Sequence, residues 1–532
     1  MAWLKKNKYL ILLATLFLVQ FLFISPIGEF PLNDDWVHAE MVEHWAKTNE
    51  FRLNPFTGPL FYTQLLYATA LTKIFGFSFS LLRLTTLLIT AGLTGGLFIF
   101  LKKHTKHESL AFLGALTIWL NPIVYELSFT FMTDIPALTC LLAAIIAFYT
   151  GFKKNQTSLF WAGSIITVLG FFIRQTNILL LPAVGLITLI RPPERKLKFW
   201  LAIIVPGLVA IGIYYWLSAL QLIGGGIDLH TFNNTQELWY HAKWWSLHTT
   251  LYLALFVLPI TLTTLKKKYF WHYLIAGGLG LFLTNWLHFF KQKTFPYVSN
   301  TINLFGLGPL SETLSGNFLP LFPPLVWLIV SSIAGIALGL LVISFWQIFK
   351  HREFYTSPQA FLALFCLFFA VPLVLFTGFD RYFLPLVLSV IILLIIENLE
   401  ARPNWPSFSI LIFLIVYGYS QTHFYLSWNR VRAELVANAF NQHQAKIHTL
   451  DSGYEWTGYH NYWSSLQLST SKRGAENSPW WIKFLITNIT REQVITATPL
   501  PGYTTVEQRQ VPGLNPNNQL YLQIKNDDSN QK

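Results

Sequence analysis

The chain has 532 residues, of which 53% are hydrophobic and only 12% carry a charged side chain, with a formal net charge of +12. Apolar residues run almost unbroken for about 17 to 23 positions at a time, enough to cross a bilayer, which excludes a soluble globular protein. The positive charge does not indicate a nucleic-acid partner, because the basic residues gather in short loops between apolar segments. Cys140 and Cys366 both lie inside apolar runs, so a disulfide framework is also excluded.

The predicted elements begin with a membrane-spanning helix at 9–25, preceded by Lys5, Lys6 and Lys8. We interpret it as a permanent helix rather than a cleaved signal peptide, because no small-residue cleavage pattern follows at 21–30. Twelve further apolar segments follow it in the chain: 79–101, 109–124, 135–152, 159–173, 178–190, 199–220, 247–265, 271–290, 322–349, 359–377, 383–396 and 408–426.

The basic clusters then all fall on one side of the membrane, the cytoplasmic side by the positive-inside rule. They lie at 102–103, 153–154, 191–198, 266–268 and 350–352. An odd number of about thirteen spans places the C-terminus outside.

The outside face receives the first loop, at 28–78, the loops near 222–246 and 291–321, and the tail from 427. In the first loop the spacing of Val37, Met41 and Trp45 predicts a short helix over 35–47 that lies along the membrane surface. The segment 58–75 is polar for a crossing helix and is also expected to be interfacial.

The tail changes character. Its pattern predicts a helix over 429–441 and strands at 445–450, 480–489 and 519–524, followed by a solvated end at 526–532. The predicted fold class is therefore an all-α polytopic membrane protein of about 13 transmembrane helices with a small C-terminal α/β extracytoplasmic domain. Residues 1–426 form the membrane part and residues 427–532 the outer domain.

Two adjacent acids, Asp34 and Asp35, stand just beyond the first span in Pro31-Leu32-Asn33-Asp34-Asp35-Trp36. One interpretation is that one of these polar residues caps the following helix. The other is that a carboxylate placed where a lipid head group meets water acts as general base on an acceptor hydroxyl.

Charged residues recur at the other outer boundaries of the spans. They are Glu126, Asp134 in Thr133-Asp134-Ile135-Pro136, Arg174, and Arg381 in Phe379-Asp380-Arg381-Tyr382. Arginines can hold phosphate oxygens, and carboxylates can hold a divalent metal that neutralises the same phosphate, so the set points to anionic lipid chemistry. The alternatives are an N-cap for Asp134, and snorkelling or pairing with Asp380 or Glu126 for the two arginines.

The order of these features resembles the GT-C superfamily of glycosyltransferases, which use polyprenyl-phosphate-sugar donors. It is most similar to the bacterial branch related to protein O-mannosyltransferases and the lipid A aminoarabinose transferase. The resemblance rests on the first helix, the outside Asp34-Asp35 pair, the interfacial segment, Thr133-Asp134-Ile135-Pro136, the late Arg381-Tyr382-Phe383-Leu384-Pro385 and the outside tail.

The resemblance implies an inverting transfer at the outer face of a bacterial cytoplasmic membrane, from a polyprenyl-phosphate sugar to a lipid, glycan or protein acceptor. Asp34 would be the catalytic base, and Asp35, Asp134, Arg174 and Arg381 would bind the donor phosphate or substrate. It also allows a divalent metal held by Asp134, Asp35 and His38.

Three other functions remain open. A transporter or flippase of lipid-linked sugars would place ionisable residues near mid-span, where this chain carries almost none. A ligase or polymerase of lipid-linked glycans is expected to use more arginines in a late outside loop. A scaffold that binds glycan through aromatic outer loops would not need Asp34.

Overall fold

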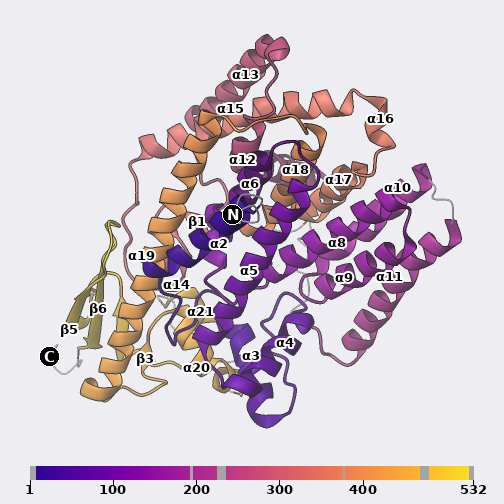
Figure 1. Cartoon of the computed structure of the whole chain (residues 1–532). Coiled ribbons are helices and arrows are strands. Elements are labelled where there is room, and N and C mark those ends of the chain that lie inside the picture. Colours follow the sequence, from indigo (N-terminus) through magenta and orange to yellow (C-terminus); the bar gives the residue numbers. More distant parts are fainter. Residues whose placement is uncertain (1–6, 192–195, 225–234, 376–377, 468–477, 527–532) are drawn as a thin grey trace.

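The structure is a computed structural model that describes residues 7–191, 196–224, 235–375, 378–467 and 478–526. Lys5 and Lys6, residues 192–195 of one basic cluster, and the chain end at 527–532 lie outside the described residues. The described part is mostly helical, as predicted, and carries a small sheet near the C-terminal end (Figure 1).

A helix covers most of each predicted apolar segment. In chain order these helices are α2 Lys8–Val19 with η1 Gln20–Leu22, α5 Phe79–Lys102, α6 Glu108–Trp119, α8 Asp134–Lys154, α9 Thr157–Phe171, α10 Leu180–Ile190, α11 Lys196–Ala219, α12 Thr235–Thr261, α13 Phe270–Lys291, α15 Pro324–Phe349, α17 Ala360–Leu375, α18 Leu384–Glu397 and α19 Trp405–His443. Among the described residues, 5 helices are long and apolar enough to cross a membrane by length and composition, namely α5, α8, α11, α13 with the preceding η3 Lys267–Tyr269, and α15. The exact number of spans stays a prediction.

Three helices depart from the predicted bounds, and one of them, α12, begins at Thr235, well before the predicted span 247–265. The predicted span 109–124 is broken, because the Asn121 side chain accepts a bond from the Ile123 N–H and starts a new short helix, α7 Pro122–Leu127, with Pro122 in its first turn. α19 runs for 39 residues without a break at 426, so the predicted helix 429–441 is its continuation. One helix is therefore shared by the membrane part and the tail.

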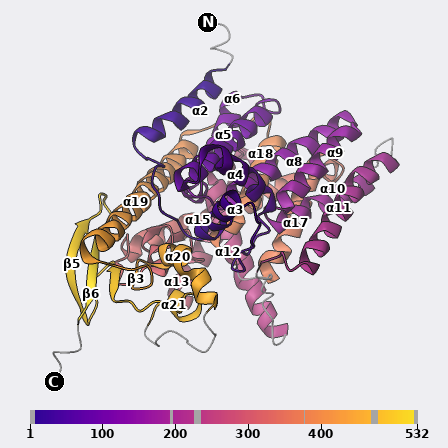
Figure 2. The same cartoon turned by 90° about the horizontal axis from the view of Figure 1, so that it is seen from below.

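The first loop forms the two predicted helices, α3 Asp35–Thr48 and α4 Tyr62–Phe75. Val37 and Met41, expected at the membrane surface, are instead buried in a cluster with Tyr454 and Trp481 of the tail. Figures 1 and 2 both place α20 Tyr454–Gln467 beside α3. The tail thus covers the first loop.

The tail contains a 4-stranded sheet in the order β3-β4-β6-β5, packed against α19. Its strands are β3 Leu450–Asp451, β4 Gln493–Thr496, β5 Tyr503–Gln510 and β6 Gln519–Lys525. β6 confirms the predicted strand 519–524, and of the predicted strand 445–450 only Leu450 is in β3.

The predicted strand 480–489 is wrong, because α21 Trp480–Phe484 lies there, with Trp481 and Ile482 buried. β4 and β5 were not predicted. β4 is buried on both faces and β5 is mostly exposed, so neither shows the alternation of a half-buried strand.

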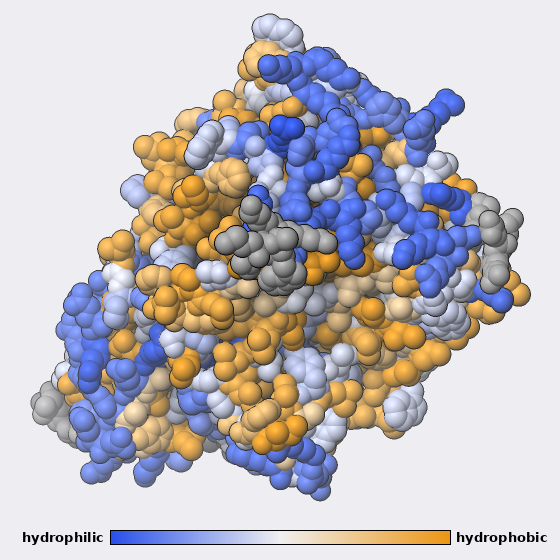
Figure 3. Space-filling view, viewed as in Figure 1, coloured by the Kyte–Doolittle hydropathy of each residue, from blue (hydrophilic) through white to orange (hydrophobic). Residues whose placement is uncertain are grey.

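The surface agrees with a membrane location. Figure 3 shows apolar side chains spread over the middle of the molecule, with hydrophilic side chains gathered toward its ends. Large exposed apolar side chains include Leu88, Leu208, Leu279, Phe282 and Val416. A surface this apolar is expected where lipid, not water, surrounds the protein.

Candidate active site

A cavity of about 300 Å³ lies where several segments predicted to be outside the membrane meet. Its lining comes from the start of α3, the segment before α4, the 132–133 turn, the 300–313 segment, the 379–382 segment and the tail. Asp34, His38, Arg174 and Arg381 line it together. The structure thus brings four of the predicted site residues to one place.

Asp34 occupies the N-cap position of α3, but its side chain accepts no capping bond from the described helix. Instead, Arg381 Nη2 donates to its Oδ2 at 3.1 Å, and the Tyr454 hydroxyl donates to its Oδ1 at 2.8 Å. The Asp34 side chain remains 34% exposed, so a substrate in the cavity can still reach it. The Asp34 side chain therefore does not cap α3, and its role as a general base stays a prediction.

The Asp35 side chain does not line the cavity. Its side chain is fully buried, and its two oxygens accept the backbone N–H groups of Leu32, at 2.6 Å, and Phe131, at 3.3 Å. Burial raises the pKa of Asp35 to about 7. Asp35 therefore ties the first loop to the segment before α8 and is not among the residues that line the cavity.

Arg381 is buried beside the cavity. It lies in η4 Asp380–Phe383 and is 4% exposed, yet its Nε and Nη1 have no hydrogen-bond partner among the described residues. Asp380 does not pair with the Arg381 guanidinium. It accepts the backbone N–H groups of Thr301 and Ile302 and so fixes η4 in place. A buried guanidinium with unpaired N–H groups beside a cavity is suited to bind an oxyanion.

Arg174 provides a second guanidinium. It stands before η2 Gln175–Leu179, and its Nε donates to Thr133 Oγ1 at 3.0 Å. Its Nη1 lies 3.1 Å from Asp134 Oδ1, and the guanidinium stacks over the Tyr382 ring at 4.7 Å. Asp134 thus orients Arg174, which matches the predicted grouping of these two residues at the outer boundary.

The predicted metal ligands do not form a metal site. His38 stacks on Phe61 with ring centroids 4.4 Å apart, and burial lowers its pKa to about 3, so it is neutral. Asp35 is bound to backbone amides and Asp134 faces Arg174. In the ranges that the structure describes, no group of three or more His, Cys, Asp or Glu side chains is placed to hold a metal ion. These residues do not fit a divalent metal.

Among the residues that line the cavity, Tyr454, Trp480 and Glu312 were not identified from the sequence as site residues. The stretch 451–459 stood out in the tail, but nothing in it indicated that Tyr454 contacts Asp34. Burial raises the pKa of Tyr454 well above its usual value, so this hydroxyl stays protonated and donates to Asp34.

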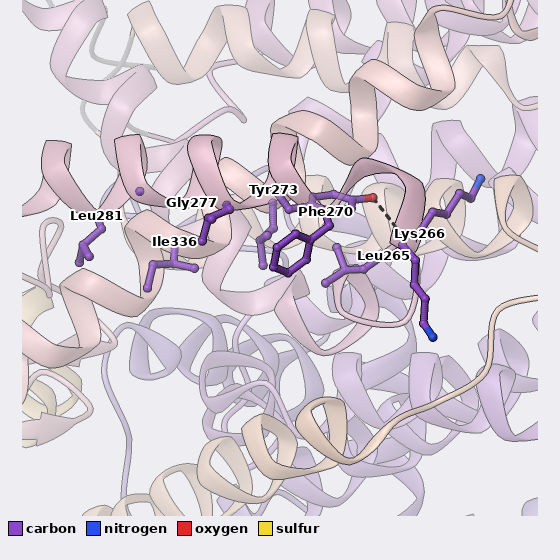
Figure 4. Close-up of a pocket in the computed structure, with 11 residues that line it drawn as sticks. Leu265, Lys266, Phe270, Tyr273, Gly277, Leu281 and Ile336 are labelled. Atoms are coloured by element: carbon purple, nitrogen blue, oxygen red, sulfur yellow. Dashed lines mark hydrogen bonds between the residues drawn. The ribbon is translucent and has the colours of Figure 1, made fainter.

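A groove of about 500 Å³ lies apart from this site, on α13 and α15. Figure 4 shows Phe270, Tyr273 and Ile336 along it, with Lys266 at one end. Lys267 also lines it, and its described lining is otherwise mostly apolar and carries no carboxylate. It is therefore not a candidate for the chemistry.

Comparisons with known proteins support the resemblance seen in the sequence. Residues 63–218 match the family model of dolichyl-phosphate-mannose-protein mannosyltransferase. This segment includes Asp134 and Arg174, and lies between Asp34 and Arg381. A comparison with curated proteins finds no match.

Two solved structures are similar over most of the chain. ArnT from Cupriavidus metallidurans bound to undecaprenyl phosphate is 11% identical, with 97% of this chain and 98% of that chain covered and a TM-score of 0.47. The archaeal oligosaccharyltransferase AglB from Archaeoglobus fulgidus, in complex with an inhibitory peptide and a dolichol-phosphate, is 12% identical, with 93% and 70% covered and a TM-score of 0.45. At these identities and TM-scores neither likeness assigns a function to this chain. Over residues 63–218, the chain is similar to the dolichyl-phosphate-mannose-protein mannosyltransferases, which confirms the resemblance for that part.

Proposed function

We propose that the protein is an integral membrane glycosyltransferase that moves a sugar from a polyprenyl-phosphate donor to an acceptor hydroxyl, with inversion at the anomeric carbon. The observation that carries this proposal is the cavity in which an accessible carboxylate, Asp34, stands beside the buried, partly unpaired guanidinium of Arg381. The family-model match to lipid-phosphate-sugar transferases supports it.

The chemistry follows from these two groups. Asp34 accepts the proton of the acceptor hydroxyl as its oxygen attacks the anomeric carbon, and the bond from that carbon to the phosphate oxygen breaks. The polyprenyl phosphate leaves as an anion and needs no proton from a general acid. Arg381, with Arg174 in the lining of the same cavity, stabilises the charge that develops on the leaving phosphate. Asp35 fixes the loop that carries Asp34.

The cavity fits a transferase better than a transporter. Asp34, Arg174 and Arg381 meet in one pocket among the outer segments, and an inward pathway would instead need charged side chains along the middle of the helices. We place the protein in a bacterial cytoplasmic membrane, with this pocket and the C-terminus on the extracytoplasmic side. The donor would reach it laterally from the bilayer.

The test is sugar transfer by the purified protein in lipid, with a panel of polyprenyl-phosphate sugars and extracted membrane glycolipids as acceptors. Asp34→Asn removes the base and keeps the side-chain shape, so we expect turnover to fall by about 10²-fold or more. Binding of the donor should be retained. Glu50→Gln, an exposed acid of the same loop, is the matched control and should be as active as the wild type.

Two results would contradict the proposal. One is a wild-type protein that binds no lipid-phosphate sugar and transfers none. The other is an Asp34→Asn variant as fast as the wild type, which would remove the base and favour a transport or scaffold role.

A further inference from the structure

A second cavity, of about 620 Å³, opens beside the first, between the 311–316 segment and the tail. Its lining combines polar side chains with two indole rings. The residues that matter here are Ser311, Glu312, Ser315, Trp480, Trp481 and Arg491.

The two cavities share a wall. Glu312 and Trp480 line both of them, and Trp480 Nε1 donates to the backbone oxygen of Glu312 at 2.9 Å. The Trp480 ring also packs on Tyr454, with centroids 5.0 Å apart, and Tyr454 binds Asp34. A molecule seated in the second cavity therefore has the catalytic carboxylate just past this wall.

The indole rings of Trp480 and Trp481 differ in exposure. Trp481 is 2% exposed, and its Nε1 donates to Asp451 at 3.3 Å, so it fixes the structure. Trp480 is 42% exposed and stands at 89° to Trp481. An accessible indole face beside hydroxyl and carboxylate groups matches a sugar, because the ring C–H groups of a sugar pack on the indole while its hydroxyls form hydrogen bonds.

The charges argue against an anionic ligand. Arg491 Nε donates to Asp451 at 3.0 Å and its Nη2 donates to Ser315 at 3.1 Å, so its positive charge is already balanced. The Glu312 carboxylate adds negative charge to the shared wall. A phosphate or acidic group would find no uncompensated guanidinium here, unlike in the first cavity, and an acyl chain would leave these polar side chains without hydrogen-bond partners.

We propose that this second cavity binds an uncharged saccharide, so that the acceptor of the proposed transfer is a glycan rather than a lipid or a protein side chain. The acceptor role rests on the proposed function. The binding itself does not, and it can be measured separately.

The experiment uses the full-length protein in lipid nanodiscs and calorimetric titration with neutral glucose, mannose and N-acetylglucosamine oligosaccharides. A Ser- and Thr-containing peptide and a phosphorylated oligosaccharide are titrated alongside. Two variants address the cavity: Trp480→Ala removes the indole face, and Ser315→Trp fills the space from a residue outside the catalytic cavity. Lys483→Gln, on the same helix as Trp480 but outside both linings, is the control.

We expect at least one neutral oligosaccharide to bind the wild type and the control alike, and both cavity variants to bind it about tenfold more weakly or not at all. Ser315→Trp should bind a short-chain polyprenyl phosphate as the wild type does, which shows that the donor site is intact. Absence of saccharide binding, equal binding by all variants, or binding of the peptide or phosphorylated probe in its place would overturn the inference. Saccharide binding without any sugar transfer would support the second cavity as a saccharide site. It would contradict the proposed function and, with it, the acceptor role.

Discussion

Asp34 and Tyr454 are 420 positions apart in the chain, and one hydrogen bond joins them. The Asp34 carboxylate accepts a hydrogen bond from Tyr454 on one oxygen and from Arg381 on the other, so both of its oxygens are held in place. A general base works only when it is aimed at the proton that it removes. In the proposed mechanism, Tyr454 of the tail therefore positions the base.

Tyr454→Phe deletes the hydroxyl and keeps the ring that packs on Trp480. We expect kcat to fall about ten- to hundredfold while the donor KM is unchanged, because a hydrogen bond to a charged group contributes about 1.5–3 kcal/mol. Steady-state kinetics measure this. Tyr462→Phe, on the same helix and in the same apolar cluster, is the control and should leave kcat unchanged. Equal kcat values for the two variants would remove the positioning role.

Glu126 shows a second residue-scale effect. It is 2% exposed in α7, and burial raises its pKa to about 8. Between its usual pKa and about 8, the folded protein keeps this proton and the unfolded chain releases it. Stability is therefore expected to fall as pH rises through this range, by up to about 1.4 kcal/mol per pH unit for one group.

Glu126→Gln mimics the protonated side chain and should flatten this decline. The clearest window is pH 7 to 8, because the pKa values of the other buried acids, Asp35 and Asp380, are raised only to about 7 and about 6. Thermal unfolding midpoints in detergent at pH 5 to 8 provide the measurement. A variant whose midpoint falls as steeply as that of the wild type above pH 7 would contradict the assignment of the proton to Glu126.

At the scale of the elements, the backbones of α13 and α15 pack closely against each other at glycine residues. A Cβ atom added at Gly280 would lie 1.9 Å from the backbone oxygen of Gly335, and one added at Gly339 would lie 2.1 Å from that of Ala276. Small residues let two helix backbones approach this closely in a membrane, where van der Waals packing holds helices together.

Gly280→Ala should therefore push the two helices apart and lower the stability by about 1–3 kcal/mol. Gly278→Ala is a close control, since it lies in the same helix and an added Cβ meets nothing within 4 Å. Unfolding in a detergent series compares the two variants. Equal stability of the two would mean that the backbones can separate at no cost.

At the scale of the whole molecule, the site is an assembly of distant segments. The first loop supplies Asp34, the segment before η2 supplies Arg174, η4 supplies Arg381, and the tail supplies Tyr454 and Trp480. The long α19 carries the tail back over the first loop, and Figure 2 shows α20 beside α3. The orientation of the protein in the membrane therefore decides from which side of the bilayer substrates reach this site.

Single cysteines test that sidedness. Gln508→Cys lies on exposed β5, and Lys267→Cys lies in the turn before α13. In intact cells, a membrane-impermeant thiol reagent should label Gln508→Cys at once, and Lys267→Cys only after permeabilisation. The unsubstituted protein, whose Cys140 and Cys366 lie inside helices, gives the background. The reverse labelling pattern would place the catalytic cavity on the cytoplasmic face.

Much of the architecture was predictable because it depends on local patterns. Apolar runs are set by the bilayer thickness, so α5, α8, α13 and α15 begin and end within a few residues of the prediction. The tail was predicted less well. The aromatic run at 480–484 has the composition of a strand, but it forms α21, because burial of Trp481 and Ile482 on one side overrides local propensity.

The sequence by itself determined the class of the protein, the helices of its membrane part, and the identities of Asp34, Arg174 and Arg381 as candidate residues. Only the tertiary structure decided what each acid does. Asp34 and Asp35 are adjacent and chemically alike, yet one faces the cavity and the other binds two backbone amides. The physical reason is that a side chain's role depends on partners hundreds of residues away, such as Arg381 and Tyr454, and no local pattern of residues records that they meet.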